Sequence, residues 1–277
     1  MSCRIQHQTC GRVRCRRVRS VAAFTLLELL MVIAIIALLI AILLPSLRAA
    51  RLISQRTKCQ SNLRQIAIGW RAYFDDHGGK FLRGINTNIN YGGRQGIGEA
   101  AWGGDPSNPI QKPLNPYMGL EEVTYDGANV FDCPSDSGSD QYKPSCFQHF
   151  GTSYFMNTFI VGPIALQANP FDPCAGLFNI ANGRIAMNHG LSAETSESSR
   201  LILVGDYGWR QYIEPFDMNQ IDWHNQPCSS NVAFLDGHVT LQRFNRGLYT
   251  TDDYMLFPFA DLARDCVACQ QELPCAN

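Results

Sequence analysis

An apolar run of 21 residues, 24–44, constrains this chain more than any other feature of its sequence. Thr25 and Glu28 are its two polar residues, and Pro45 follows it directly. A run of this length and composition is long enough to cross a bilayer as a helix. A carboxylate in hydrocarbon costs about 2.5–3.5 kcal/mol on insertion scales. Glu28 therefore needs a partner that offsets its burial.

Basic residues are concentrated in front of the run. Of the 23 Lys and Arg residues, six arginines lie in residues 1–23, which leaves 17 basic against 24 acidic residues in the rest of the chain. By the positive-inside rule, the arginines hold the N-terminus in the cytoplasm and place the rest of the chain outside the inner membrane. The acidic remainder argues against a nucleic-acid partner, which would need a basic face on the folded domain.

Three kinds of N-terminal segment combine basic residues with an apolar run: a cleavable signal peptide, a signal anchor and a prepilin leader. A signal peptide usually has an apolar core of about 7–15 residues, whereas residues 29–44 alone give 16 without interruption. A plain anchor gives no reason to keep Glu28. Both observations favour the third kind of segment.

The segment "AFTLLELL" (residues 23–30) resembles the processing site of type IV pilins and type II secretion pseudopilins. In that family a prepilin peptidase cuts before the Phe and methylates the new amino terminus. The resemblance places the cut between Ala23 and Phe24, although the family usually has Gly where this chain has Ala23. Glu28 and Pro45 then become residues 5 and 22 of the mature chain, which are characteristic positions of the family.

Cleavage would give Phe24 a positive amino group with which Glu28 can pair. The two groups lie about 6 Å apart along one helix, at a rise of 1.5 Å per residue, so the amine can belong to the same helix or to a neighbouring subunit. Either pair offsets the burial of the carboxylate, and a pair between subunits also sets their stagger in an assembly. Alternatively, Glu28 snorkels to the lipid headgroups. Pro45 lacks an amide hydrogen and is expected to kink or loosen the helix.

After the run, apolar residues recur with the spacing of one helix face. Gly78 and Gly79 are stop signals that end the predicted helix near Asp76. The sequence therefore predicts one helix over residues 24–76, with an assembly half (24–45) and an amphipathic half (46–76). The expected apolar stripe consists of Leu52, Cys59, Leu63, Ile66, Trp70 and Tyr73.

Residues 77–277 are predicted to form a β-rich head with long loops, and residues 82–120 to be mostly irregular. Strands are expected at 130–132, 153–157, 184–188 and 201–205. The segment "NVAFLDGHVTLQRF" predicts a hairpin with a two-residue type I′ turn at Asp236-Gly237. The expected fold class is α+β and pilin-like, with the long helix packed on an antiparallel sheet.

Further segments resemble a group of bacterial pseudopilin-like proteins of unknown function. They are "CQSNLRQIAIGWRAYFDDHGGKF", "VFDCPSD", "SYFMN" and "LILVGD". The hallmark of that group is a His, nine residues and then Asp-Gly, and here 11 residues separate His224 from Asp236-Gly237.

The resemblance implies a non-enzymatic pseudopilin-like subunit with an enlarged head. Its implied location is the bacterial inner membrane, as a single-pass protein or within a filament. The implied partners are the prepilin peptidase, other pilin or pseudopilin subunits and the membrane itself. The alternative is a membrane-anchored envelope protein with a ligand-binding or hydrolytic head.

The head offers several candidate sites, each with a structural alternative. His224, Asp236 and His238, together with His189, could serve catalysis or metal binding. Alternatively, Asp236-Gly237 makes a turn and His224 holds a neighbouring loop. No Ser/His/Asp arrangement with supporting local context and no phosphate-binding loop is present.

No cofactor is predicted, but calcium stays open. The segment "DSGSD" (residues 136–140) is acidic yet lacks the spacing of an EF-hand loop. Related pseudopilins can bind calcium in a C-terminal loop, and the acidic residues that leave this open here are Asp217, Asp222, Asp252 and Asp253.

Eight of the 11 cysteines follow the apolar run, and an even number on the exported side predicts disulfides without giving their pairing. Cys266-x-x-Cys269 resembles half of a zinc or redox motif. Trp102, Trp209 and Trp223 lie in predicted loops, where they would either bind a ligand or fill the core.

Overall fold

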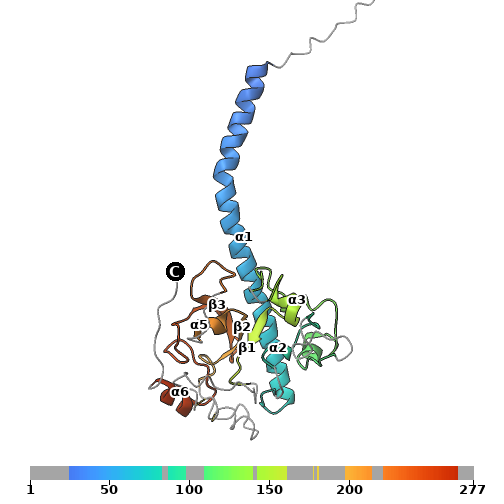
Figure 1. Cartoon of the computed structure of the whole chain (residues 1–277), viewed down its shortest axis with the longest axis vertical. Helices are drawn as coiled ribbons and strands as arrows, with labels where there is room; N and C mark the ends of the chain where they lie inside the picture. The colour runs from blue at the N-terminus through green and yellow to red at the C-terminus, as the bar shows by residue number, and fades with distance from the viewer. Residues whose placement is uncertain are drawn as a thin grey trace, which may run out of the picture. The chain divides into compact units, whose positions relative to one another are not determined.

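One helix, α1 (Leu26–Asp76), dominates the N-terminal part of the computed structural model (Figure 1). Its end at Asp76 confirms the prediction. Gly78 and Gly79 follow with φ of 60° and 73°, in the left-handed region that glycine tolerates best. The amide of Gly79 donates to the carbonyl of Phe74 at 2.7 Å, which satisfies one of the last carbonyls of the helix.

The structure describes residues 25–82, 87–97, 109–139, 142–160, 177, 180, 197–213 and 221–267. The fold is α+β, with α1 followed by a four-stranded antiparallel sheet and short helices. The chain divides into two units, residues 1–48 and 49–277, and α1 contributes residues to both.

In the first unit, the side chains of α1 are exposed throughout the described part of the apolar run, from Leu26 to Leu44. The helix is long and apolar enough to cross a membrane by length and composition. It continues through Pro45 without interruption. Because proline has no amide hydrogen, the carbonyl of Ala41 loses its helical donor. The hydroxyl of Ser46 donates to the carbonyl of Leu43 at 2.8 Å.

In the second unit, one face of α1 is buried in the hydrophobic core. The predicted stripe is confirmed from Cys59 onward, but Leu52 is 37% exposed and does not belong to it. Leu52 lies one turn before Gln55, whose side chain donates to the carbonyl of Pro134 at 3.2 Å. The members of the stripe that are buried are Cys59, Leu63, Ile66, Trp70 and Tyr73.

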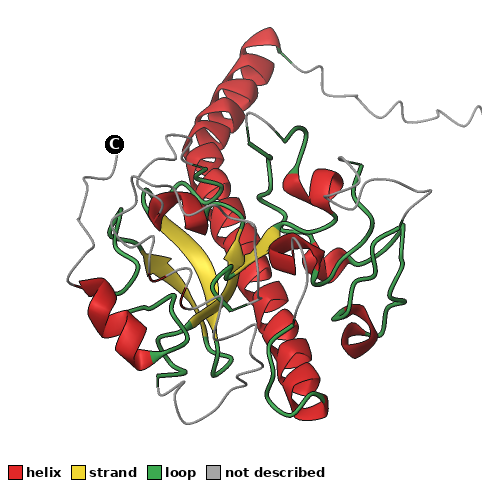
Figure 2. Cartoon of the chain, turned by 60° about the horizontal axis from the view of Figure 1, so that its bottom comes forward, coloured by secondary structure: helices red, strands yellow, loops and turns green. Residues whose placement is uncertain are grey.

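The sheet lies against the second half of α1 (Figure 2). Its strands are β1 (Tyr154–Met156), β2 (Ile202–Asp206), β3 (Ser229–Phe234) and β4 (Val239–Arg243), and they are ordered as in the sequence. The strands predicted at 153–157 and 201–205 and the C-terminal hairpin are confirmed. Every residue of β1 and β2 is buried, so both faces of the sheet are covered at these strands even though β1 lies at its edge.

Short helices complete the described part of the head. They are α2 (Thr87–Asn90), η2 (Asn115–Met118), η3 (Asn129–Phe131), α3 (Cys146–Phe150), α5 (Trp209–Ile213) and α6 (Ala260–Val267). The strand predicted at 130–132 is wrong, because η3 forms a 3₁₀ turn there. Ala128 starts that turn in the left-handed region, with φ of 54°, and Phe131 is buried. The strand predicted at 184–188 lies outside the described residues.

The hairpin turn differs from the predicted two-residue type I′ turn. The amide of Phe234 donates to the carbonyl of His238, and the amide of Gly237 donates to the carbonyl of Phe234, both at 2.9 Å. Gly237 has φ of 92°, whereas Asp236 is not in the left-handed region. The connection is therefore a three-residue loop that ends on a left-handed glycine, the next commonest hairpin geometry.

Lys112 is 0% exposed, and its ammonium nitrogen Nζ lies 3.1 Å from Asn90 Oδ1. Burial lowers its pKa to about 7. At pH values between about 7 and the pKa of about 10.4 that lysine has in an unfolded chain, the unfolded state binds one proton more than the folded state. Stability should therefore rise with pH above 7, by up to about 1.4 kcal/mol per unit.

In the Lys112→Met variant, the free energy of unfolding should no longer rise with pH in this way. Denaturant unfolding of the full chain in detergent, between pH 6.5 and 8.5, measures the free energy of unfolding of both chains. Because every other titrating group is common to both, the difference between the two curves isolates Lys112. Parallel curves would contradict the assignment of an uncharged lysine in the folded state.

Candidate functional site

Three polar side chains lie on one face of the sheet. Tyr154 on β1 pairs with Asp206 on β2, and Asn231 occupies the matching position on β3. This face meets α1: Asn62 Nδ2 lies 3.2 Å from the Tyr154 hydroxyl, and Gln60 Nε2 donates to Asn231 Oδ1 at 3.0 Å. Strand alternation thus creates a polar row inside the interface between helix and sheet.

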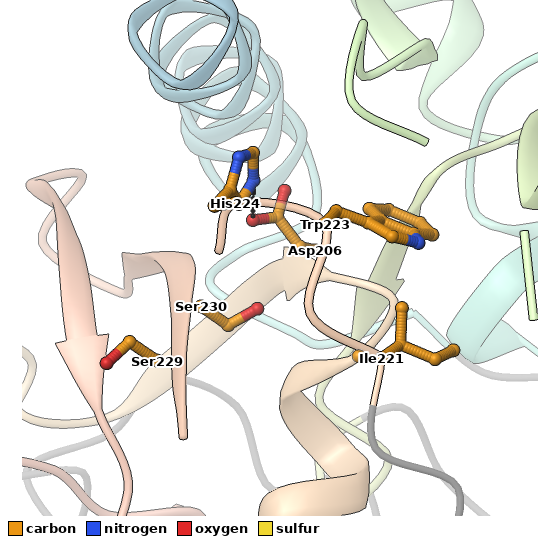
Figure 3. Close-up of a pocket in the computed structure, with 7 residues that line it drawn as sticks. Asp206, Ile221, Trp223, His224, Ser229 and Ser230 are labelled. Atoms are coloured by element: carbon orange, nitrogen blue, oxygen red, sulfur yellow. Dashed lines mark hydrogen bonds and ion pairs between the residues drawn. The ribbon is translucent and has the colours of Figure 1, made fainter. Parts of the chain in front are cut away.

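Asp206 is the centre of this row. Its Oδ2 accepts hydrogen bonds from His224 Nε2 at 2.8 Å, from the Asn231 amide at 3.0 Å and from Asn231 Nδ2 at 2.9 Å. The side chains of Asp206 and His224 are both 2% exposed (Figure 3). Asn231 Nδ2 also lies 2.8 Å from His224 Nε2. Since both nitrogens serve Oδ2 as donors, the network assigns the Nε2–H form to His224.

Two buried atoms of this pair have no hydrogen-bond partner within the described part of the chain: Asp206 Oδ1 and His224 Nδ1. A buried acceptor without a donor costs about 1–3 kcal/mol, so orphaned atoms of this kind call for an explanation. A pocket adjoins the pair, and its other lining residues include Ile221, Trp223, Ser229 and Ser230 (Figure 3).

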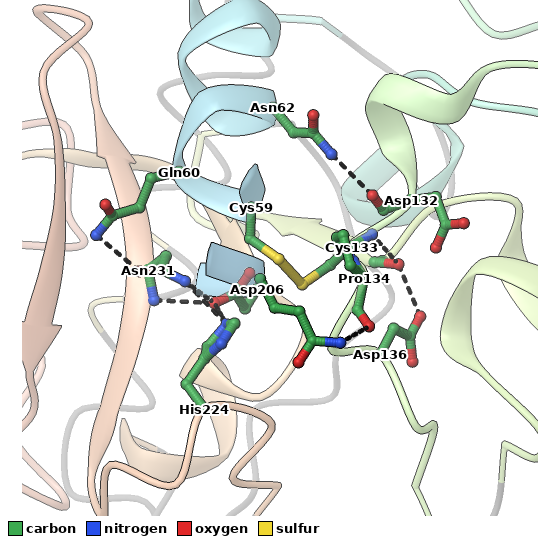
Figure 4. Close-up of a disulfide and its surroundings, with 12 residues drawn as sticks. Cys59, Gln60, Asn62, Asp132, Cys133, Pro134, Asp136, Asp206, His224 and Asn231 are labelled. Atoms are coloured by element: carbon green, nitrogen blue, oxygen red, sulfur yellow. Dashed lines mark hydrogen bonds and ion pairs between the residues drawn. A yellow bond between two sulfur atoms is a disulfide. The ribbon is translucent and has the colours of Figure 1, made fainter. Parts of the chain in front are cut away.

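A disulfide between Cys59 and Cys133 lies beside the pair (Figure 4). It joins α1 to the segment after η3, and both cysteines are buried. The sulfur atoms and one ligand atom each of Asp206 and His224 all lie within 4.8 Å of one another. The prediction of disulfides is confirmed for this pair, and Cys228 is disulfide-bonded as well.

The cluster joins segments that stand far apart in the sequence. Cys59 comes from "CQSNLRQ", Cys133 from "VFDCPSD" and Asp206 from "LILVGD", and His224 precedes β3. The sequence prediction included His224 but missed the other members as site residues. A signal was available for Asp206, because it ends the apolar strand segment "LILVGD", where a charged residue is unusual unless it has a partner.

Of the residues considered for catalysis or metal binding, His224 pairs with Asp206 and not with Asp236. Asp236 Oδ1 pairs instead with Nδ1 of His238 at 2.6 Å, in the exposed turn of the hairpin. The structural alternative for Asp236-Gly237, a turn, is confirmed. The fourth residue of the predicted grouping, His189, lies outside the described residues.

In the acidic segment considered for calcium binding, Asp136 is a structural anchor. Its Oδ1 accepts from two backbone amides, and its Oδ2 accepts from the Phe147 amide and the Ser153 hydroxyl. Burial raises the pKa of Asp136. Asp222 is similarly engaged, because its Oδ1 accepts from the amides of His224 and Gln226. Asp252 and Asp253 are exposed, and Asp140 and Asp217 lie outside the described residues.

Two of the three tryptophans considered for ligand binding are buried. Trp209 Nε1 donates to the carbonyl of Phe155 at 2.9 Å, and Trp223 Nε1 donates to the carbonyl of Gly138 at 3.1 Å. Both therefore fill the core and anchor loops, as the structural alternative predicted. Trp102 and Cys269 lie outside the described residues, and Cys266 is buried on α6.

At the N-terminus, Glu28 has a local partner that the sequence prediction overlooked. Its Oε2 accepts from the amide and the hydroxyl of Thr25, each at 2.9 Å, and its own amide donates to Thr25 Oγ1 at 3.2 Å. This reciprocal pattern is a capping box, and its signature Thr-x-x-Glu is readable in the sequence. The predicted processing residues, Ala23 and Phe24, lie outside the described residues.

Comparison of the chain with models of protein families gave no match. The curated proteins and the solved structures gave none either. The function must therefore be argued from the residues and their geometry.

Proposed function

We propose that this chain is a pseudopilin-like subunit of a type II secretion or type IV pilus-like assembly in the cell envelope. A prepilin peptidase cuts it between Ala23 and Phe24 and methylates the new amine. The subunit catalyses no reaction. It inserts into the inner membrane with its head outside and assembles with other pilin or pseudopilin subunits through residues 24–45.

One observation carries this proposal: α1 is a single helix whose two parts have opposite environments. Its first part is apolar and exposed, whereas one face of its second part is buried in the core of the head. An exposed apolar surface of this size needs lipid or other subunits to cover it. A tether alone would not require the helix to continue as a core element of the domain that it anchors.

The capping box refines the role proposed for Glu28. Before processing, Thr25 satisfies the carboxylate, and the carboxylate satisfies the amide of Thr25 at the helix start. After processing, the amine of Phe24 adds a positive charge next to this cap. Glu28 then has two functions in the proposal: it starts the helix within one chain, and it attracts the amine of a neighbouring chain.

The mature N-terminus tests the proposal directly. Intact-mass and N-terminal peptide analysis of the protein extracted from its native membrane should show a chain that begins at methylated Phe24. A strain without prepilin peptidase should yield the longer chain, which serves as the control. An intact leader in the presence of the peptidase would overturn the proposal.

A membrane-anchored envelope protein with a hydrolytic or ligand-binding head is the alternative, and the buried His224–Asp206 pair is the observation in its favour. This alternative predicts the longer chain in both strains. The same mass measurement therefore distinguishes the two functions.

A further inference from the structure

The buried cluster beside α1 carries an inference that is independent of the proposed function. We propose that Cys59, Cys133, Asp206 and His224 bind one Zn²⁺ ion when the two cysteines are thiols. In this view the disulfide and the metal ion are alternative links between helix and head at the same place.

Each of the four side chains is of a type that binds zinc. Zinc in proteins is bound by Cys thiolate, His imidazole and Asp or Glu carboxylate, and its structural sites are four-coordinate and tetrahedral, with bond lengths of about 2.0–2.3 Å. Ligand atoms around such an ion therefore lie about 3–4 Å from one another. The four atoms here already lie within 4.8 Å of one another, so small side-chain movements close the tetrahedron once the sulfurs separate.

The unpartnered oxygen of Asp206 supplies a second, independent observation. Asp206 Oδ1 is a buried acceptor without a donor, and a metal ion satisfies a lone pair of this kind. Burial of the four residues excludes bulk water from the site. The disulfide-bonded state leaves this lone pair unused, whereas the zinc-bound state can use it.

The surroundings already orient the ligands. Asn231 donates to Asp206 Oδ2 through its backbone amide and its side chain, and Gln60 holds Asn231 through Oδ1 at 3.0 Å. Outer contacts that fix the orientation of ligating carboxylates and imidazoles are typical of metal sites. Asn231 and Gln60 are therefore positioning residues in this proposal.

The thiol state arises because the chain is synthesised in a reducing compartment, where cysteines stay unpaired. It can also be regenerated by a dithiol reductant, which gives two electrons and two protons to the disulfide and becomes a disulfide itself. Zinc binding to the two thiols releases two protons. Subsequently a disulfide oxidant can take two electrons from the two thiolates and, with two protons from solvent, become a dithiol, while the Cys59–Cys133 bond forms and the zinc ion is released.

Metal analysis of the full chain in detergent tests the proposal. The protein is prepared once oxidised and once anaerobically with a phosphine reductant, then dialysed against Zn²⁺ or Co²⁺. The reduced protein should hold about one zinc ion per chain more than the oxidised protein. Its cobalt form should show the absorption of a tetrahedral thiolate site.

Variants assign the metal to these residues. The double variant Cys59→Ser/Cys133→Ser should lose the additional ion and the cobalt absorption. His224→Gln should weaken zinc binding at least about tenfold. Cys146→Ser is the matched control, because Cys146 is a buried thiol outside the cluster, and it should bind zinc like the unmodified chain.

Three results would overturn the proposal. The reduced chain could bind no additional ion, the cobalt absorption could persist in the double variant, or His224→Gln could leave affinity unchanged. If the reduced chain is unfolded without metal, zinc should restore its circular dichroism spectrum. Failure of zinc to do so would count equally against the site.

Discussion

Replacing Glu28 with Ala should reduce incorporation of this chain into an assembly at least about tenfold, while its insertion into the membrane stays intact. The substitution removes the only acidic side chain of the apolar run. In the proposed assembly, it leaves the amine of the neighbouring Phe24 without a counter-charge in a low-dielectric environment. Removing one partner of a buried ion pair costs about 3–5 kcal/mol. A tenfold loss of incorporation corresponds to only about 1.4 kcal/mol.

Two further variants separate the charge of Glu28 from its capping role. Glu28→Gln keeps an oxygen that can accept from the Thr25 amide, but it has no charge, so it should fail to assemble as Glu28→Ala does. Thr25→Val removes the hydroxyl of the cap and keeps the charge, so it should assemble nearly normally. Co-purification with tagged partner subunits measures incorporation. Normal assembly of Glu28→Gln would mean that Glu28 acts only as a helix cap and that its charge has no role in assembly.

The largest effect on the stability of the head is expected for Asp206→Ala. The change removes the acceptor for three buried donors, two on Asn231 and one on His224. Each buried donor that is left without an acceptor lowers stability by about 1–3 kcal/mol. The three losses are not additive, because the donors belong to one network. We expect the free energy of unfolding to fall by about 3–5 kcal/mol, measured by denaturant unfolding of the oxidised chain.

Asp236→Ala is the matched control for this prediction. Asp236 also pairs with a histidine, at 2.6 Å, but in an exposed turn where water can replace the carboxylate. Its loss should cost less than about 1 kcal/mol. Equal losses for the two variants would mean that the buried network does not stabilise the head more than a surface pair does.

The elements that were predicted correctly have strong local signals. The end of α1 follows from two glycines, the buried face of its second half from a 3.6-residue period, and the C-terminal hairpin from two alternating runs around Asp-Gly. The turn type could not be predicted in the same way. Asp-Gly fits both a two-residue and a three-residue loop, and the register of β3 and β4 decides between them.

The predictions failed where the answer depends on contacts between distant segments. The segment Val-Phe-Asp at 130–132 fits a strand or a 3₁₀ turn equally well, and local sequence does not decide between them. His224 was considered together with Asp236 because both belong to the His…Asp-Gly pattern of the resembling family, whereas its partner Asp206 is 18 residues upstream. The pairing of Cys59 with Cys133 spans 74 residues, and spacing alone gives no information about it.

The Cys59–Cys133 bond also has a mechanical consequence. A pull transmitted along α1 enters the head through this covalent link as well as through the backbone that leaves the helix at Asp76. Residues 60–132 lie inside the loop that the disulfide closes. Force applied along α1 therefore bypasses these residues. The last turns of α1, with their aromatic contacts, are protected from a force that would otherwise pull the helix out of the core.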